Sequence, residues 1–136
     1  MAHQLSFNAV YQYDTLETGI TLEVILGIGS KVQRASAKLD TSASYCFFQR
    51  EYAEALGLDV ESGERISVLT ATGVFVAYGH QIILEVLEIV FDTTVYFSSE
   101  YGFPRNVLGR QGWLDRVRLG LVDYEGVLYL SDYNDA

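Results

Sequence analysis

This sequence is poor in the residues that build disulfides and metal sites. Its 136 residues include one cysteine, one proline and two histidines. The lone Cys46 excludes an internal disulfide, and with only two histidines beside it the chain has no spacing typical of a metal site. Flanked by aromatic residues, Cys46 is expected to be a small buried hydrophobe. We expect no metal, no cofactor and a reducing compartment such as the cytoplasm.

Positive charge and long apolar runs are also scarce. The formal net charge is -9 at pH 7, which argues against nucleic acid as a partner because Lys and Arg bind its phosphates. No apolar run reaches the roughly 18 residues that a membrane helix needs. The opening MAHQLSFNAVYQY lacks the basic and apolar regions of a secretory signal. The sequence therefore predicts a cytoplasmic protein with no membrane partner.

The amino-acid composition is typical of one folded domain. Hydrophobic residues make up 49% of the chain, enough to build a core. One proline and the absence of low-complexity stretches give no sign of a linker or an internal repeat. Residues 1–136 are therefore predicted to form a single domain.

Much of the chain alternates apolar and polar residues, which is the pattern of half-buried strands. The runs ITLEVILGIG (20–29) and QRASAKLD (33–40) both alternate, and the residues between them suggest a turn. TATG (70–73) is predicted to be a hairpin tip, because Gly73 can adopt a positive φ. A further turn is expected at 92–94.

The remaining elements are one helix and two short segments near the end. In CFFQREYAEALGLD (46–59), Phe48, Tyr52, Ala55 and Leu56 follow helical spacing, and Gly57 is placed to end the helix. NVLGRQGWLDRV (106–117) predicts a buried strand, a glycine turn and a helical turn, and GVLYL (126–130) predicts a last strand. The pattern favours a mainly β, closed or sandwiched fold with one small helix.

An aspartate followed by threonine occurs three times, at Asp14, Asp40 and Asp92. Asp14 and Asp92 lie in segments that predict ordinary Asx-type turns. Only Asp40 ends an alternating strand and is followed by three small residues, Ser42 to Ser44. Small residues let a backbone or a second chain approach closely, and hydroxyl and backbone N–H groups can bind a carboxylate.

Two segments together resemble a known family. LDTSASYCFFQREYAEALGL (39–58) resembles the active-site segment of retroviral-type (retropepsin-like) aspartic proteases, including single-domain members of bacterial type. PRNVLGRQGWL (104–114) resembles their apolar-apolar-Gly-Arg segment, and TATG lies where the family carries its flap hairpin. The resemblance extends from about Leu22 to Leu130.

The resemblance implies a closed antiparallel β-barrel of retropepsin-like type with one short helix, assembled as a homodimer in which terminal strands join across the interface. It implies an aspartic endopeptidase without a cofactor, whose water is activated by two copies of Asp40 and whose substrate is an extended peptide or protein. The implied roles are catalysis and its geometry (Asp40, Thr41), substrate binding by the floor and flap (Ser42, Ala43, Ser44, Ala71, Thr72, Gly73, Val74) and structural support (Val107, Leu108, Gly109, Arg110).

The sequence departs from the family pattern at two positions. Ser42 stands where the family nearly always has glycine, so its Cβ could crowd a partner chain or tilt the backbone N–H that supports the carboxylate. Ser44 stands where retroviral enzymes have an acid that pairs with the arginine matching Arg110. Two alternatives follow: a weak or inactive retropepsin-like dimer that binds peptides, and an unrelated monomeric β-domain with Asp40 in an ordinary turn.

Overall fold

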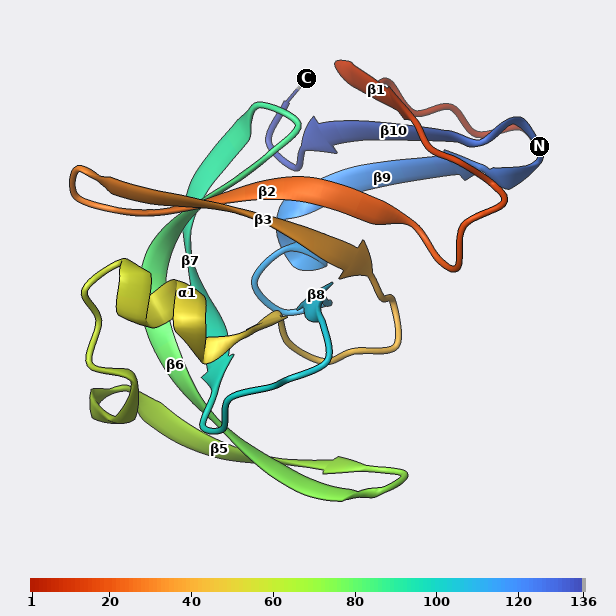
Figure 1. The fold of residues 1–136 in the computed structure, drawn as a ribbon. Coiled ribbons are helices and arrows are strands. Elements are labelled where there is room, and N and C mark those ends of the chain that lie inside the picture. Colours follow the sequence, from red (N-terminus) through yellow and green to blue (C-terminus); the bar gives the residue numbers. More distant parts are fainter. Residues whose placement is uncertain (136) are drawn as a thin grey trace.

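The computed structural model describes residues 1–135, which form a β structure with one short α-helix (Figure 1). The strands are β1 (Ala9–Gln12), β2 (Thr21–Ile28), β3 (Lys31–Leu39), β4 (Phe47–Phe48), β5 (Glu64–Thr70), β6 (Gly73–Val86), β7 (Ile89–Ser98), β8 (Asn106–Leu108), β9 (Val117–Val122) and β10 (Val127–Asp132). The helical elements are α1 (Arg50–Ala55) and the 3₁₀ turns η1 (Val60–Ser62), η2 (Leu114–Arg116) and η3 (Asp123–Glu125).

Six strands close into a barrel. Their order is β2-β3-β8-β4-β7-β6, and a pairing of β2 with β6 completes the circle. Most pairings are antiparallel, whereas β3 with β8 and β4 with β7 run parallel. Strand β5 pairs with the first half of β6, and the two strands form a hairpin that projects from the barrel (Figure 1). The prediction of a closed barrel with one short helix is confirmed, with two short parallel pairings added.

The barrel interior is filled by the alternating apolar residues that the sequence singles out. On β2, Leu22, Val24 and Leu26 are fully buried, and Ala35 and Ala37 on β3 lie in the same core. Burying a leucine or valine side chain contributes about 1.5–3 kcal/mol, so this face fixes the register of the β2–β3 hairpin.

The helix begins later than its spacing suggests. Phe48 belongs to strand β4, and α1 starts at Arg50. Ala53 is the buried residue of this helix, whereas Ala55 is exposed. Phe48 has no exposed surface, and its strand pairs with both β7 and β8. Pairing with two neighbouring strands outweighs the local preference for helix.

The turn expected at 92–94 is wrong. Strand β7 runs through this segment, and Asp92 pairs with Ile83. The chain turns instead at Leu87 and Glu88, with φ of 49° and 67°. A two-residue turn with positive φ at both positions matches the twist of a hairpin, and Asn-Gly is its usual signal. Leu-Glu gives no such signal.

A second, three-stranded sheet holds the two ends of the chain together, in the order β1-β10-β9 (Figure 1). Ala9 pairs with Leu130 of the same chain, and the joining of terminal strands across an interface between two chains stays a prediction. Leu128 and Leu130 of β10 are fully buried in the main core, so this sheet packs on the barrel. Within residues 1–135, no helix has the length and apolar character needed to cross a membrane.

Candidate active site

The parallel pairing of β3 and β8 brings two distant loops together. Parallel strands end at the same edge of a sheet, and Leu39 lies opposite Leu108, the last residues of the two strands. The segment after β3 begins with Asp40, and the segment after β8 begins with Gly109. The backbone N–H of Asp40 donates to the carbonyl oxygen of Leu108 at 3.0 Å, which fixes the start of the first loop.

Two more backbone hydrogen bonds join these loops. The N–H groups of Arg110 and Gln111 donate to the carbonyl oxygens of Ala43 and Ser44 at 2.9 and 2.8 Å. The approach is so close that a Cβ on Gly109 would lie 2.1 Å from the carbonyl oxygen of Tyr45. A side chain at this position would push the loops apart, which explains the need for glycine.

Ser42 holds the carboxylate of Asp40 in place. The backbone N–H of Ser42 donates to Oδ1 of Asp40 at 2.9 Å, and its hydroxyl donates to the same oxygen at 2.5 Å. The expectation that a Cβ here would tilt the N–H away is wrong within this chain, since the N–H keeps its bond. The Ser42 hydroxyl lowers the pKa of Asp40 against the opposing effect of burial, helped by backbone N–H groups and the charge of Arg105. Asp40 is therefore ionised at neutral pH.

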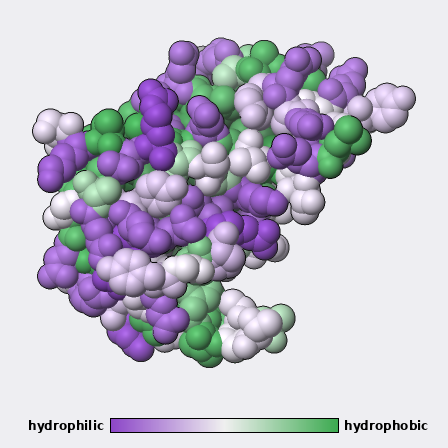
Figure 2. Space-filling model, in the orientation of Figure 1, coloured by the Kyte–Doolittle hydropathy of each residue, from purple (hydrophilic) through white to green (hydrophobic). Residues whose placement is uncertain are grey.

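Asp40 lies at the floor of the largest described hollow, a cleft of about 830 Å³. Figure 2 shows the opening between the projecting β5–β6 hairpin and the rest of the molecule. Its lining includes eight of the residues that the sequence assigns to catalysis, substrate binding or support: Asp40, Ser42, Ala43, Ser44, Thr72, Gly73, Val74 and Val107. The fold thus places the predicted floor and flap on opposite sides of one cleft.

The other five predicted residues lie outside this cleft. Thr41 and Arg110 line a neighbouring cavity of about 440 Å³, together with Ser44 and Asp115. Ala71 is exposed at the tip of the hairpin, whereas Leu108 and Gly109 are buried beneath the loops. Among residues 1–135, Arg110 makes no ion pair within 4.0 Å.

Sequence reasoning missed an aromatic wall of the cleft. Phe47, Phe75 and Phe103 all line it, with ring centroids 5.2 Å apart for Phe47 and Phe75 and 5.1 Å apart for Phe75 and Phe103. It also missed Arg105, which lines the cleft beside Pro104. The run GFPR directly before the NVLG strand was the available signal.

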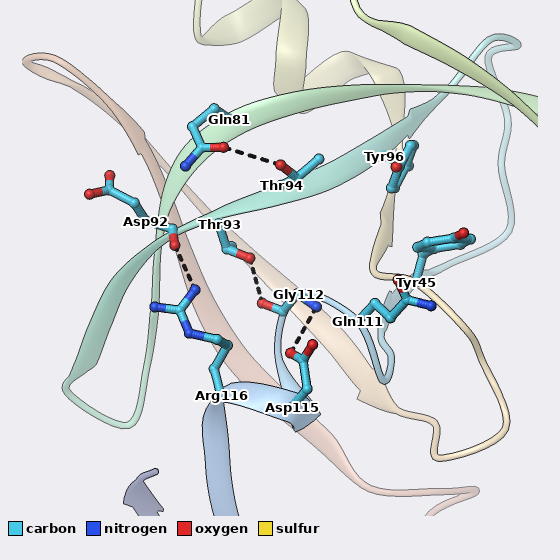
Figure 3. A pocket seen from close by; sticks show the side chains of 10 residues that line it. All are labelled: Tyr45, Gln81, Asp92, Thr93, Thr94, Tyr96, Gln111, Gly112, Asp115 and Arg116. Atoms are coloured by element: carbon cyan, nitrogen blue, oxygen red, sulfur yellow. Dashed lines mark hydrogen bonds between the residues drawn. The ribbon is translucent and has the colours of Figure 1, made fainter. Parts of the chain in front are cut away.

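A third cavity, of about 350 Å³, is lined by residues of β6, β7 and the segment that follows β8, together with Tyr45 (Figure 3). Thr93 donates its hydroxyl hydrogen bond to the carbonyl oxygen of Gly112 at 2.8 Å, and Arg116 donates to the carbonyl oxygen of Asp92 at 2.9 Å. Figure 3 shows these bonds joining β7 to the loop. Asp40 does not line this cavity. The hydrogen bonds of Thr93 and Arg116 hold the segment after β8 against β7.

The remaining reactive side chain, Cys46, is buried as the sequence predicts. Burial raises the pKa of its thiol to about 12, and its sulfur accepts a hydrogen bond from the N–H of Gly109 at 3.4 Å. A protonated, enclosed thiol is no nucleophile. In the part of the chain described, no three His, Cys, Asp or Glu side chains gather as a metal site requires.

An aspartate that lines a cleft together with the tip of a β-hairpin is the arrangement that the resemblance to aspartic proteases implied. A sequence model of the aspartyl protease family matches residues 20–111. This is more than half of the chain, and the protein belongs to this family. No curated protein matches the sequence.

Two of the solved structures that share the fold are proteases. One is described as a retropepsin-like aspartic protease from Rickettsia conorii, with 18% identity and a TM-score of 0.59, covering 85% of this chain and 100% of that one. The other is EIAV protease complexed with the inhibitor HBY-793, with 16% identity and a TM-score of 0.55, covering 72% of this chain and 88% of that one. The retropepsin-like fold expected from the sequence is confirmed.

Proposed function

We propose that this protein is an aspartic endopeptidase that works as a homodimer, each chain supplying Asp40. One observation carries this proposal: Asp40 is the single acidic side chain among the described residues that line the cleft. Peptide hydrolysis by carboxylates needs a base and an acid. A second copy of the chain is the simplest source of the other carboxylate, and two-fold dimers are the commonest oligomers.

The chemistry follows from placing the two carboxylates side by side. Like charges that share a site cannot both ionise cheaply, so one carboxyl keeps its proton and the pair titrates as a unit, as is general for aspartic proteases. The ionised Asp40 takes a proton from a water, which attacks the scissile carbonyl carbon. The protonated Asp40 polarises the carbonyl oxygen, and the leaving nitrogen is protonated as the C–N bond breaks.

The residues around Asp40 have roles that suit this chemistry. Thr41 is exposed beside Arg110, so its hydroxyl is available to bond the partner chain and hold the two loops in register. Ser42 to Ser44 form the floor, and residues 71–74 form a hairpin that covers the substrate and excludes water. An extended peptide binds between them by strand-like backbone hydrogen bonds, with its apolar side chains against the aromatic wall.

One observation favours the alternative of a peptide-binding dimer. The Ser42 hydroxyl bonds Oδ1 of Asp40 at 2.5 Å, so it occupies acceptor capacity that a bound water would otherwise use. If this bond persists when peptide enters, the dimer binds peptides and cleaves them slowly.

The deciding experiment compares the protein with Asp40→Asn. Both are incubated with an unfolded protein substrate from about pH 3 to pH 7, with and without a statine-type inhibitor. Asp14→Asn is a matched control, because Asp14 is exposed and caps a turn by accepting from the N–H of Leu16 at 2.9 Å. We expect fragments from the wild type and the control, none from Asp40→Asn, and inhibition by statine. A wild type that is dimeric, binds peptide and yields no fragments would instead favour the binding module.

A further inference from the structure

The cleft differs in charge from the rest of the molecule. The whole chain has 18 acidic and 9 basic residues. Asp40 and Arg105 are the two charged side chains among the described residues lining the cleft, and the others are apolar, aromatic, glycine or hydroxyl residues. Arg105 is thus the single cation among the described residues of this lining, and Asp40 is the single anion.

Within the described part of the chain, no ion pair occupies the guanidinium of Arg105. It is exposed, and neither of the two ion pairs found within residues 1–135 involves it. Its positive charge also makes a small contribution to lowering the pKa of the Asp40 carboxyl. Arginine is suited to bind a carboxylate, because its planar fork can donate two parallel hydrogen bonds.

The reach of this charge limits where a partner group can lie on the peptide. Exposed charges attract each other over about 10 Å at ordinary ionic strength, and an extended peptide advances roughly 3.3 Å per residue. A group that Arg105 attracts therefore lies within about three residues of the bond above Asp40.

We infer that Arg105 selects peptides with an acidic side chain within about three residues of the scissile bond, an inference that rests on the proposed peptidase function. The preference is local, since the acidic surface as a whole repels such a peptide at long range. Arg105 is thus a specificity-determining residue, and glutamate or aspartate is the side chain that it recognises.

The test uses mixtures of eight-residue peptides, blocked at both ends and randomised except for one fixed position that carries Glu, Gln or Lys. Wild-type protein, Arg105→Lys, Arg105→Glu and the control Arg34→Glu are compared for cleavage rate. Arg34 is an exposed residue of β3 outside the cleft lining, so its variant makes the same change in net charge elsewhere. Binding to Asp40→Asn, alone and combined with each substitution, is measured by fluorescence anisotropy as a readout that needs no cleavage.

We expect the wild type to prefer Glu over Gln by about fivefold at one or two positions, which is typical of a partly exposed charge pair. Arg105→Lys and Arg34→Glu keep the preference, whereas Arg105→Glu reverses it in favour of Lys. Cleavage without this reversal overturns the role of Arg105 and leaves the peptidase standing. Selective binding of the Glu mixture without cleavage refutes the proposed peptidase function but supports the role of Arg105 in selecting acidic peptides. If no mixture is bound and none is cleaved, both the peptidase function and the selectivity of Arg105 are overturned.

Discussion

At the scale of single residues, Ser42 is the main cause of the lowered pKa of Asp40. Its hydroxyl and its N–H both donate to one carboxylate oxygen, and hydrogen bonds to the charged form lower the pKa of a carboxyl. A serine in this position therefore acts as a second donor to the carboxylate, in addition to the backbone donor that a glycine would supply.

Replacing Ser42 by glycine should shift the pH profile and keep or raise activity at the optimum. The lowered pKa of Asp40 means that its ionised form persists as the pH falls to that pKa. Losing the hydroxyl raises the pKa, so the acid limb of kcat/KM should move to higher pH. Ser44→Gly is the matched control, because no hydrogen bond joins the Ser44 side chain to Asp40 among the described residues. Identical acid limbs in the two variants, or a clear loss of activity in Ser42→Gly, would contradict this assignment.

Gly109 should tolerate no side chain. Its added Cβ would meet backbone atoms of Tyr45 and Ala43 at 2.1 to 2.8 Å, and overpacking of this kind costs about 1–3 kcal/mol or more. Gly109→Ala should lower the free energy of unfolding by roughly 3 kcal/mol in urea titrations. Gly27→Ala, where the nearest atoms lie 3.7 Å away, should change it much less. Equal effects would show that the close loop approach is unimportant.

At the residue scale, sequence reasoning selects a position where a pattern surrounds it; Asp40 lines the cleft, and its catalytic role stays a prediction. Asp40 was found because it ends an alternating strand and precedes small residues. Arg105 was missed because it lies in a loop, where no periodicity shows which way a side chain points. Its place in the cleft depends on β8 lying between β3 and β4.

At the scale of elements, the β6–β7 turn is under strain. Leu87 and Glu88 both adopt left-handed φ without being glycine or asparagine, a conformation that costs roughly 1 kcal/mol per residue. The hairpin tolerates this because ten residue pairs join β6 and β7, from Val86–Ile89 to Ala77–Ser98.

Glu88→Gly should therefore stabilise the protein by about 0.5–1 kcal/mol, because glycine adopts positive φ without strain, although it gains entropy in the unfolded chain. Glu88 is exposed, so little packing is lost. Glu85→Gly, inside β6 where Glu85 pairs with both Ile25 and Val90, should destabilise, since glycine weakens a strand interior. Urea denaturation of the three proteins measures both effects, and a destabilised Glu88→Gly would refute the strain argument.

The sequence predicted elements well where local patterns decide them. The β2–β3 hairpin, the hairpin tip at Gly73 and the strand–turn–helical-turn segment after Pro104 all occur as expected. Strand β4 was missed because its two residues fall within a helix-like spacing, and their conformation depends on pairing with β7 and β8.

At the scale of the whole molecule, the proposed shared site makes activity depend on both chains. Mixing wild type with Asp40→Asn, after subunit exchange, should reduce activity in proportion to the square of the wild-type fraction, because only dimers with two intact chains cleave. An equal mixture should retain roughly a quarter of the full activity. Dilution with Asp14→Asn should leave activity unchanged. A linear decrease with Asp40→Asn would show that one chain suffices.

Closure of the barrel lay beyond sequence reasoning. It depends on β2 meeting β6, with Val24 opposite Val86, and no local pattern encodes a contact between residues so far apart in the chain. The pairing of β1 with β10 is of the same kind. The retropepsin-like barrel was predicted from the resemblance to a family, whereas its strands were predicted from the alternation of apolar and polar residues.

The three-stranded sheet also makes the chain a candidate for circular permutation. The side-chain amide of Asn8 donates to the carboxylate of Asp135 at 2.9 Å, so a short linker in place of residues 1–7 could join Asn8 to the end of β10, a situation in which circular permutation is commonly tolerated. New ends placed between Ala71 and Thr72 would cut the hairpin tip while preserving every side chain of the barrel. Such a permutant would separate the covering role of the hairpin from the chemistry of the cleft floor.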